Sequence, residues 1–575
     1  MPYINGVYMA TPGVSISVND SNFTAQNAGQ GLGVILIGPA VDGQPKTPIS
    51  IPNAAAALTM LKGGDLLQAV LNVFAGASAI GQVPSQVIVF RPEQATQGTS
   101  TIADSSGTAQ IALTTTLYGQ VANQARWQVT AASGGVGYKV SQALDYTGPG
   151  GQTYNTIPQD NINLPVLSLY YTGTGTTPTV SVTDSNLTIT ATSGGTQTTL
   201  ANITLTSDMT VQALANQLNQ VSGLTVAVLD TNPNDTVAAF FDNVSNVAVS
   251  TSASSPTVLY ANVTAVVRWF NKVNGYFTAV RQAGATSLAT SNTWTYATGG
   301  ATPTASNSDW QACYTLAQSL TGLFLIQPVS PSYTLWAMND AHCGYMASLG
   351  QPRRGYVGDV AGQTITTELQ QVQNINSSRT SIVWPEQQEV DYNGQQVTMA
   401  PYLVASYVMG MRAAAPPYQA LTNQAVPSNG IGQQVSPSMV AQGVQGGLCM
   451  IAPNQTGQIV VIRDRTTWLQ NTAYDKVENS TGLVVDIITS DLNQTLLSYI
   501  GQAMSAATVG SASAKILSRL TYWYNLGYLS TKPSASDISL SGSGDAITGT
   551  VTLYPDVPTN YVVITLNPQA TTVAA

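Results

Sequence analysis

One pair of neighbouring side chains has the residue types of a nucleophilic site. His342 is the single histidine of the chain, and Cys343 follows it directly. A Cys–His nucleophile requires the imidazole to meet the thiol in space. Both residues fall in a segment near 332–349 that we expect to be helical, and adjacent helical residues do not face each other. We therefore expect a packed or surface histidine rather than a catalytic pair.

The three cysteines do not have the spacing of a metal site. Cys313, Cys343 and Cys449 are separated by 30 and 106 residues, which matches no zinc-binding pattern. The N-terminal segment MPYINGVYMATPGV lacks a basic region and a continuous apolar run, so we expect no secretory signal. An odd, sparse set of cysteines in such a chain is typical of reduced thiols in a cytosol. The sequence predicts no metal site.

Three carboxylates lie within six residues of one another. Glu386, Glu389 and Asp391 follow Pro385 and precede Asn393-Gly394. Paired carboxylates can carry out acid–base chemistry or bind Ca²⁺. Pro and Asn-Gly are typical of turns, so the alternative that we favour is a solvated turn.

Two further motifs could bind ligands. Gly29, Gly31 and Gly33 loosely resemble a dinucleotide fingerprint, but that fingerprint follows a strand, whereas these glycines precede one. A loop is therefore expected. Arg353-Arg354 could hold an acidic partner, and the simpler expectation is a charged start to a strand. The chain has no GxxxxGK[ST] and no GxSxG motif, so we predict no cofactor and no catalytic residue.

The segments around these residues alternate between strand and helix. Residues 33–37 form a continuous apolar run, as buried parallel strands do. Asn53 is placed to cap a helix over 54–61, and Asp65 with Gln68 forms a capping-box pattern for a second helix. The alternation resumes after residue 305, where Ser308 and Gln311 form another such pattern. These patterns predict a mainly parallel sheet wrapped by helices, with later strands near 323–326, 355–357, 381–384 and 459–462 and later helices near 332–349, 363–374 and 399–414.

Residues 96 to about 300 have a different character. Thr, Ser and Gly dominate, and short alternating runs recur, as at 187–191 and 203–205. Thr210 is placed to cap a helix with one apolar face. We expect an inserted β-rich domain, or two, between the halves of the α/β core.

Both ends of the chain are strand-like. Val14, Ile16 and Val18 alternate with polar residues, which is the period of a half-buried strand. Residues 561–566, with the sequence YVVITL, are expected to form a final strand. Helices are expected over 491–504 and 516–529. Because neither terminal strand has an obvious partner nearby in sequence, we expect its partner to be distant or on another chain.

The composition excludes several functional classes. The chain has 575 residues, enough for two to four domains. Only 18 residues are basic and 27 acidic, 8% in all against about 25% in ordinary proteins. Nucleic-acid binding needs clustered Lys and Arg, and no apolar run approaches the roughly 20 residues of a membrane span. We expect neither partner, and we expect a permanent assembly to cover much of the surface.

Several segments, in their order, resemble contractile phage tail sheath proteins. Val7-Tyr8 with Pro12-Gly13-Val14 is similar to the family's N-terminal segment, and residues 33–70 are similar to its first α/β unit. Residues 381–417 are similar to a family segment in which a strand is followed by a helix of small residues that ends at prolines. Residues 447–468, with Arg465-Thr466, are similar to a hairpin-like passage. The resemblance covers about 1–95 and 305–575, whereas 96–300 matches only as a place where such proteins carry variable outer domains.

The resemblance implies a mechanical role. Many copies would polymerise helically around a tail tube, and contraction from a metastable extended state would drive the tube through the host envelope without ATP. The implied partners are further copies of the chain, the tail tube protein, and baseplate, terminator and neck proteins. The implied location is the virion, after assembly in the host cytoplasm. The alternatives are a tailocin or secretion-type sheath, a β-rich S-layer protein or adhesin, and an α/β enzyme.

The expected fold is therefore mixed α/β: a discontinuous α/β core with an inserted β-rich outer domain and strand-like terminal arms. The resemblance also implies that the arms add strands to neighbouring copies, and for the surface facing the tube we favour the C-terminal part. The expected division is an arm at 1–22, a core at 23–95 and 305–485, an outer insertion at 96–304, an inner part at 486–555 and an arm at 556–575. The residues assigned to the arms are Val7, Tyr8, Val14, Ile16, Val18, Val562, Val563, Ile564 and Leu566, and those assigned to the tube-facing surface are Asn493, Gln494, Lys515 and Arg519.

Overall fold

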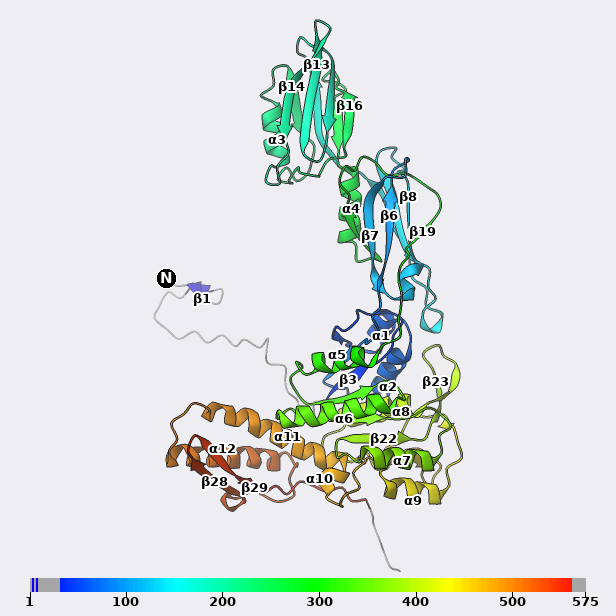
Figure 1. Ribbon diagram of the computed structural model, residues 1–575, viewed down its shortest axis with the longest axis vertical. Helices are drawn as coiled ribbons and strands as arrows, with labels where there is room; N and C mark the ends of the chain where they lie inside the picture. Colours follow the sequence, from blue (N-terminus) through cyan, green and yellow to red (C-terminus); the bar gives the residue numbers. More distant parts are fainter. Residues whose placement is uncertain (1–2, 5–6, 9–31, 561–575) are drawn as a thin grey trace, which may run out of the picture.

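The computed structural model describes residues 3–4, 7–8 and 32–560. The molecule is elongated, with a broad α/β body at one end and two β-rich modules stacked beyond it (Figure 1). Both ends of the continuous stretch 32–560 lie at the body. No described helix is long and apolar enough to cross a membrane.

One eight-stranded sheet forms the centre of the body. Its strand order is β27-β26-β22-β21-β20-β3-β5-β4. The six inner strands are parallel, and the two edge strands run antiparallel to their neighbours. The predicted α/β fold class is confirmed. The strands are β3 (Gly33–Ile37), β4 (Ile49–Ser50), β5 (Gln86–Phe90), β20 (Phe324–Pro328), β21 (Arg353–Val357), β22 (Thr380–Trp384), β26 (Leu448–Pro453) and β27 (Ile459–Arg463).

Helices cover both faces of this sheet, because the inner strands are apolar on both sides. One face packs on α1 (Ala54–Leu61), α2 (Asp65–Ile80) and α8 (Pro401–Ala414). The other face packs on α5 (Asn307–Ala317), α6 (Tyr333–Ser348), α7 (Ile365–Ile375) and α9 (Pro437–Gly446).

The contact between α2 and α8 depends on two glycines. A Cβ at Gly76 would lie 2.2 Å from the Tyr407 carbonyl oxygen, and a Cβ at Gly410 would lie 2.2 Å from the Val73 carbonyl oxygen. The two helix backbones therefore approach each other more closely than any larger residue permits.

Two helix starts differ from the predicted caps. Asn53 and Thr210 cap their helices as predicted, since each side chain accepts a hydrogen bond from the backbone three residues on. Gly64, not Asp65, is the N-cap of α2, and the Gln68 side chain donates to Asn72. In α5 the capping box is formed by Ser306 and Asp309 rather than by Ser308 and Gln311. Each pattern was misplaced because neighbouring polar residues offer equivalent sequence signals.

The chain between β5 and β20 builds two modules with separate cores. The middle module contains two sheets, β18-β7-β6 and β10-β9-β8-β19, with one helix. Its elements are β6 (Gln97–Ala103), β7 (Ala109–Tyr118), β8 (Ala125–Ala131), β9 (Tyr138–Leu144), β10 (Ile157–Ile162), α4 (Asn262–Lys272), β18 (Phe277–Arg281) and β19 (Thr295–Tyr296).

The distal module, residues 165–260, lies farthest from the body (Figure 1). It contains the sheets β15-β11-β17 and β14-β13-β12-β16 and one helix around its own apolar core. Its elements are β11 (Pro165–Tyr171), β12 (Thr176–Val182), β13 (Asn186–Ser193), β14 (Thr196–Thr204), α3 (Val211–Leu218), β15 (Leu224–Val228), β16 (Val244–Ala248) and β17 (Thr257–Tyr260).

The C-terminal part forms a lobe at the side of the body. It consists of α11 (Asn479–Leu496), α12 (Ala506–Asn525) and a hairpin of β28 (Ile538–Ser543) and β29 (Ala546–Val551), around a small apolar core. The short helix α10 (Tyr474–Val477) precedes it. The helices expected over 491–504 and 516–529 were wrongly bounded, because α11 begins 12 residues earlier and α12 begins 10 residues earlier. Polar residues at those starts hide the helical period.

Candidate functional site

The histidine and its neighbouring cysteine do not form a catalytic pair. His342 is buried in α6, and its Nε2 accepts a hydrogen bond from Arg353 Nη1 at 2.7 Å. Burial and the nearby guanidinium lower the pKa of His342 to about 3, so its imidazole is neutral and a weak base. Burial raises the pKa of the Cys343 thiol to about 12. The thiol is therefore protonated at neutral pH and unreactive.

The acidic residues after Pro385 are not a solvated turn throughout. Glu386 is buried, and its Oε2 accepts from Gln433 Nε2 at 2.8 Å. Glu389 lies on a strand, β23 (Gln387–Val390), of a small sheet completed by β24 (Gln396–Met399) and β25 (Gly430–Ile431). Only Asp391 occupies a turn, where it accepts from two backbone amides. Among the described residues, no group of three or more His, Cys, Asp or Glu has the geometry to hold a metal ion.

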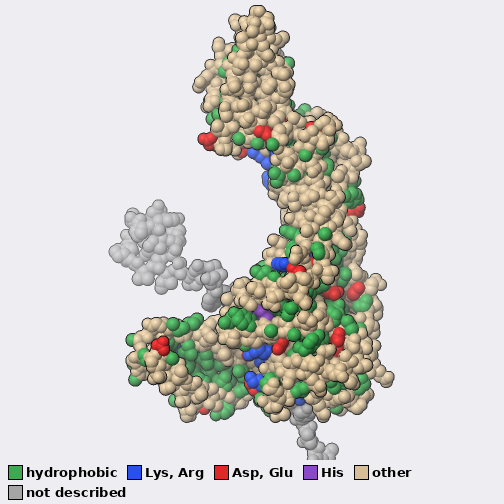
Figure 2. Space-filling view, in the orientation of Figure 1, with side chains coloured by type: hydrophobic (Ala, Val, Ile, Leu, Met, Phe, Trp, Pro, Cys, Tyr) green, Lys and Arg blue, Asp and Glu red, His purple; other side chains and the backbone are tan. Residues whose placement is uncertain are grey.

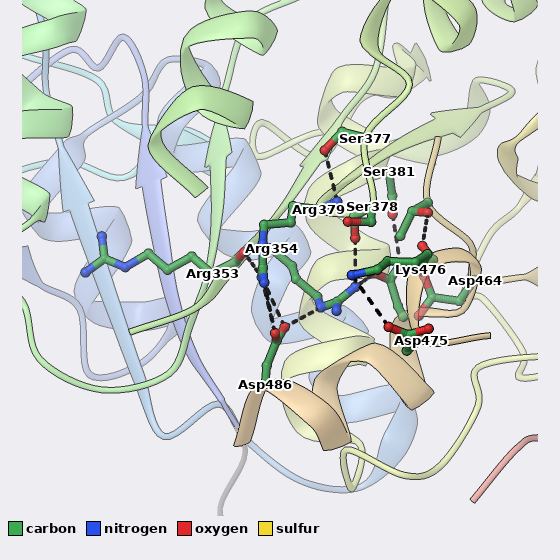
Figure 3. Close-up of polar contacts among 12 residues, drawn as sticks. Arg353, Arg354, Ser377, Ser378, Arg379, Ser381, Asp464, Asp475, Lys476 and Asp486 are labelled. Atoms are coloured by element: carbon green, nitrogen blue, oxygen red, sulfur yellow. Dashed lines mark hydrogen bonds and ion pairs between the residues drawn. The ribbon is translucent and has the colours of Figure 1, made fainter. Parts of the chain in front are cut away.

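Arg353 and Arg354 begin β21, as expected of a charged start to a strand, but both are buried, on its opposite faces. Figure 3 shows their side chains pointing in opposite directions. Arg353 contacts α6 and donates to the Ala317 and Leu320 carbonyl oxygens. Arg354 points toward the C-terminal lobe. Because successive strand residues face opposite sides, one dipeptide connects the sheet to two different layers.

Asp486 on α11 is the acidic partner of Arg354. The Arg354 Nε donates to Asp486 Oδ2 at 2.7 Å, and Arg379 Nη2 lies 3.2 Å from Asp486 Oδ1 (Figure 3). The side chains of Arg354 and Asp486 are 4% and 7% exposed. A carboxylate between two guanidiniums forms charge-assisted hydrogen bonds. This contact, which we call the Arg–Asp clamp (Arg354, Arg379 and Asp486), joins the lobe to the sheet.

Asp464 forms a second buried polar centre beside the clamp. Asn479 at the start of α11 donates to Asp464 Oδ1 at 2.7 Å and to Ser381 Oγ at 2.8 Å. The Tyr356 hydroxyl donates to Asp464 at 3.0 Å. Burial raises the pKa of Asp464, and the nearby Arg412, 4.0 Å away, opposes that rise. The N-terminal half of α11 is therefore held to the sheet by paired polar groups.

The last described residues lie along the same junction. Asn560 Nδ2 donates to Glu478 Oε1 at 3.0 Å, and its Oδ1 accepts from Thr422 Oγ1 at 3.1 Å. Glu478 also accepts from Arg463 Nε at 2.6 Å. Four residues before Asn560, the backbone carbonyl oxygen of Asp556 accepts a hydrogen bond from Thr481 Oγ1. Residues 552–560 are thus fixed to the body beside the lobe.

The lobe carries an apolar groove and two strand edges. The groove of about 590 Å³ lies between α11, α12 and the β28–β29 hairpin, and Leu496, Ile516 and Leu540 are among its lining residues. The hairpin is a sheet of its own, so neither strand has a second neighbour within the described part of the chain. Leu497 and Ile500 at the end of α11 are 57% and 77% exposed, and Figure 2 shows hydrophobic side chains gathered on this lobe. Together, these features can accept an added strand.

The residues assigned to the tube-facing surface all lie on this lobe. Asn493 and Gln494 on α11 and Lys515 on α12 are exposed. Arg519 is half-buried and forms a bidentate pair with Asp491, with Nε–Oδ2 2.8 Å and Nη2–Oδ1 2.7 Å. These assignments stay predictions.

Most residues assigned to the arms fall outside the described residues. These are Val14, Ile16, Val18, Val562, Val563, Ile564 and Leu566. Val7 and Tyr8 form β2 (Val7–Tyr8), which pairs antiparallel with β1 (Tyr3–Ile4) of the same chain. Of the Arg–Asp clamp, Arg354 was named as able to hold an acidic partner, whereas Asp486 and Arg379 were missed in the sequence. Only the rarity of charged residues in the chain sets them apart, since each Arg or Asp in a charge-poor chain has a raised chance of being paired.

Comparison with known proteins identifies relatives of the chain. No protein-family model matches it. It is 23% identical over 523 residues to a tail sheath protein of Bacillus phage SP01, covering 89% of this chain and 88% of that protein. The sheath tail protein DSY3957 of Desulfitobacterium hafniense has the same fold, with a TM-score of 0.56 at 11% identity over 94% and 96% of the two chains. The sheath tail protein Lin1278 of Listeria innocua gives 0.54 at 12% identity over 92% of each chain.

Proposed function

Since the resemblance to tail sheath proteins is confirmed in sequence and in fold along most of the chain, we propose that this protein is the structural subunit of a contractile tail sheath. Copies of it polymerise helically around a tail tube and contract from a metastable extended state, without ATP, to drive the tube through the host envelope. The observation that carries the proposal is the match over 89% of the chain to a phage tail sheath protein. The buried, protonated Cys343 and the weakly basic His342 are consistent with a protein that is not an enzyme.

The proposed links between copies are strands exchanged at the C-terminal lobe. The β28–β29 hairpin offers two strand edges, and an unprotected edge pairs readily with an added strand. The terminal segment 14–18 alternates apolar and polar residues as such strands do, and the segment 561–566 is rich in the β-branched residues that strands favour. On one face of an extended 562–566 segment, Val562, Ile564 and Leu566 would meet the apolar groove of a neighbouring copy. Backbone pairing of this kind tolerates rotation of whole subunits while the cores repack, which supports a switch between two packings.

The point at which the C-terminal arm leaves the body supports this arrangement. Asn560 is held by Thr422 and Glu478 next to the lobe. Asn560, the last described residue, therefore lies at the junction between the body and the lobe. We propose that one copy receives an arm and sends its own arm from neighbouring parts of one surface.

The remaining roles follow from position in the fold. We propose that the middle and distal modules form the outer surface of the sheath, because they project away from the lobe (Figure 1). The lobe, with Asn493, Gln494, Lys515 and Arg519, is then the surface that faces the tube. Baseplate, terminator and neck proteins are the proposed partners at the two ends of the polymer, and the proposed place of assembly is the host cytoplasm.

Removal of residues 1–18 tests this function. The truncated chain should remain folded and soluble, because the apolar cores of the described chain begin at Leu32. It should fail to form tubular polymers in negative-stain electron micrographs, whereas the full chain should form them. Polymers of normal appearance from the truncated chain would refute the proposed N-terminal link, and a full chain that never forms tubes would refute the proposed function.

A further inference from the structure

A cleft in the distal module lies outside the segments proposed to link copies. It has a volume of about 930 Å³ and lies between β14, the end of α3 and the loop after β11. Figure 1 shows α3 and β14 side by side at the end of the molecule farthest from the body. Its lining residues are Tyr171, Gly173, Thr174, Thr199, Leu200, Ala201, Asn202, Ile203, Gln217, Gln220, Val221 and Ser222.

The cleft carries no charge. Residues 165–260 contain no Lys, Arg, His or Glu, and their five charged residues are all Asp. Three of these five are used at the joint with the middle module: Asp184 pairs with Arg281, Asp235 with Arg268, and Asp242 accepts from the first amides of α4. No aspartate lines the cleft. Anionic ligands, which need cationic partners, are therefore disfavoured.

Many polar side chains of the cleft are unpaired in the described chain, although Asn202 Oδ1 accepts from Thr188 Oγ1 at 3.2 Å. On the outer face of the β14-β13-β12-β16 sheet, side chains bond to one another, as Thr179 does to Thr190 at 2.9 Å. By contrast, within the described residues no hydrogen bond is made by the side chains of five residues that line the cleft, Thr174, Thr199, Gln217, Gln220 and Ser222. Hydroxyl and amide groups that have no hydrogen-bond partner can form hydrogen bonds to a ligand without breaking an existing contact.

The floor of the cleft is apolar. Leu200, Ile203 and Val221 are half-buried there, and the exposed Thr, Gln and Ser residues surround them. Gly173 allows the loop after β11 to pack closely against the Tyr171 side chain, because a Cβ at this position would lie 2.2 Å from the Tyr171 hydroxyl oxygen. An apolar floor with a neutral rim of donors and acceptors matches a pyranose ring, which has C–H faces and hydroxyl edges.

We propose that this cleft binds a neutral glycan. Gln217 and Gln220 provide the planar amides that donate to and accept from sugar hydroxyls, and Leu200, Ile203 and Val221 contact the C–H face of the ring. This site is independent of the proposed contraction, because it lies outside the α/β body and the C-terminal lobe.

The test is binding of the full chain to an array of neutral oligosaccharides of glucose, galactose, mannose and N-acetylglucosamine, with sialylated and sulfated oligosaccharides alongside. The Gln217→Ala/Gln220→Ala double variant should bind the selected neutral oligosaccharide roughly tenfold more weakly by titration calorimetry, since at least two hydrogen bonds are lost. Gln212→Ala is the matched control, because Gln212 is an exposed glutamine on the same helix that bonds to Asn216 and does not line the cleft.

All three substituted glutamines are exposed, so the variants should melt at the wild-type temperature. Loss of binding in the double variant with retention in Gln212→Ala would support the site. The absence of binding to any neutral oligosaccharide, preference for the anionic ones, or equal binding by the double variant would overturn it.

Discussion

Arg354 and Asp486, 132 residues apart in the sequence, meet at 2.7 Å in the buried junction between the central sheet and the C-terminal lobe. The strand residue and the helix residue are each almost fully buried. The lobe carries the strand edges proposed to receive arms, and the sheet belongs to the body that would rotate during contraction. We propose that part of the force on an arm enters the body through the Arg–Asp clamp.

Replacing Asp486 by Asn should strongly destabilise the chain. The substitution leaves two guanidiniums facing a neutral amide, and breaking a buried ion pair from one side costs about 3–5 kcal/mol. Unfolding in urea, followed by circular dichroism, measures the loss.

Asp491→Asn is the control on the same helix. Asp491 also pairs with an arginine, but the side chains of Arg519 and Asp491 are 30% and 19% exposed. Solvent screens this partly exposed pair more than it screens the clamp, so this variant should lose less stability. Equal losses in the two variants would show that the clamp does not hold the lobe.

The stability of the chain should depend on pH through Glu368. This residue of α7 is fully buried, and neither of its carboxylate oxygens has a hydrogen-bond partner in the described part of the chain. Burial, with Asp359 and Glu386 nearby, raises the pKa of Glu368 from 4.5 to about 8. The folded chain keeps this proton between pH 4.5 and 8 while the unfolded chain releases it. The free energy of unfolding should therefore fall as pH rises through this window, by at most about 1.4 kcal/mol per pH unit from this group.

Glu368→Gln should remove that contribution. The amide has the same shape and no charge, so the variant should be more stable than the wild type at pH 8 and nearly equal to it at pH 4.5. Melting temperatures across this range are the measurement. A variant whose stability falls with pH as steeply as that of the wild type would rule out Glu368 as the source.

Replacing Val563 by proline should impair assembly while leaving the stability of the fold nearly unchanged. Proline removes a backbone donor and cannot occupy a paired central strand. If residues 561–566 pair with a neighbouring copy, the variant should polymerise poorly while its melting temperature changes little. Sedimentation of polymers and a thermal melt give the two quantities. Comparable damage to both would mean that this strand pairs within its own subunit.

Local patterns predicted most of the central sheet, because apolar runs such as 33–37 and helix caps such as Asn53 depend on neighbouring residues alone. The Arg–Asp clamp could not be predicted in this way, since its partners are brought together only by the packing of α11 on β21 and β22. The prediction of a solvated turn at Glu386 was wrong for the same reason. Its flanking residues are typical of a turn, but Glu386 is buried and accepts a hydrogen bond from Gln433, 47 residues away. The apolar groove depends on four elements and has no local signature.

A density map of the assembled particle shows where the two arms lie. Strand exchange requires that residues 14–18 and 561–566 each continue a β28–β29 hairpin that belongs to a different copy. A map in which both segments fold back onto the subunit that carries them would contradict the strand exchange and, with it, the proposed mechanism of contraction.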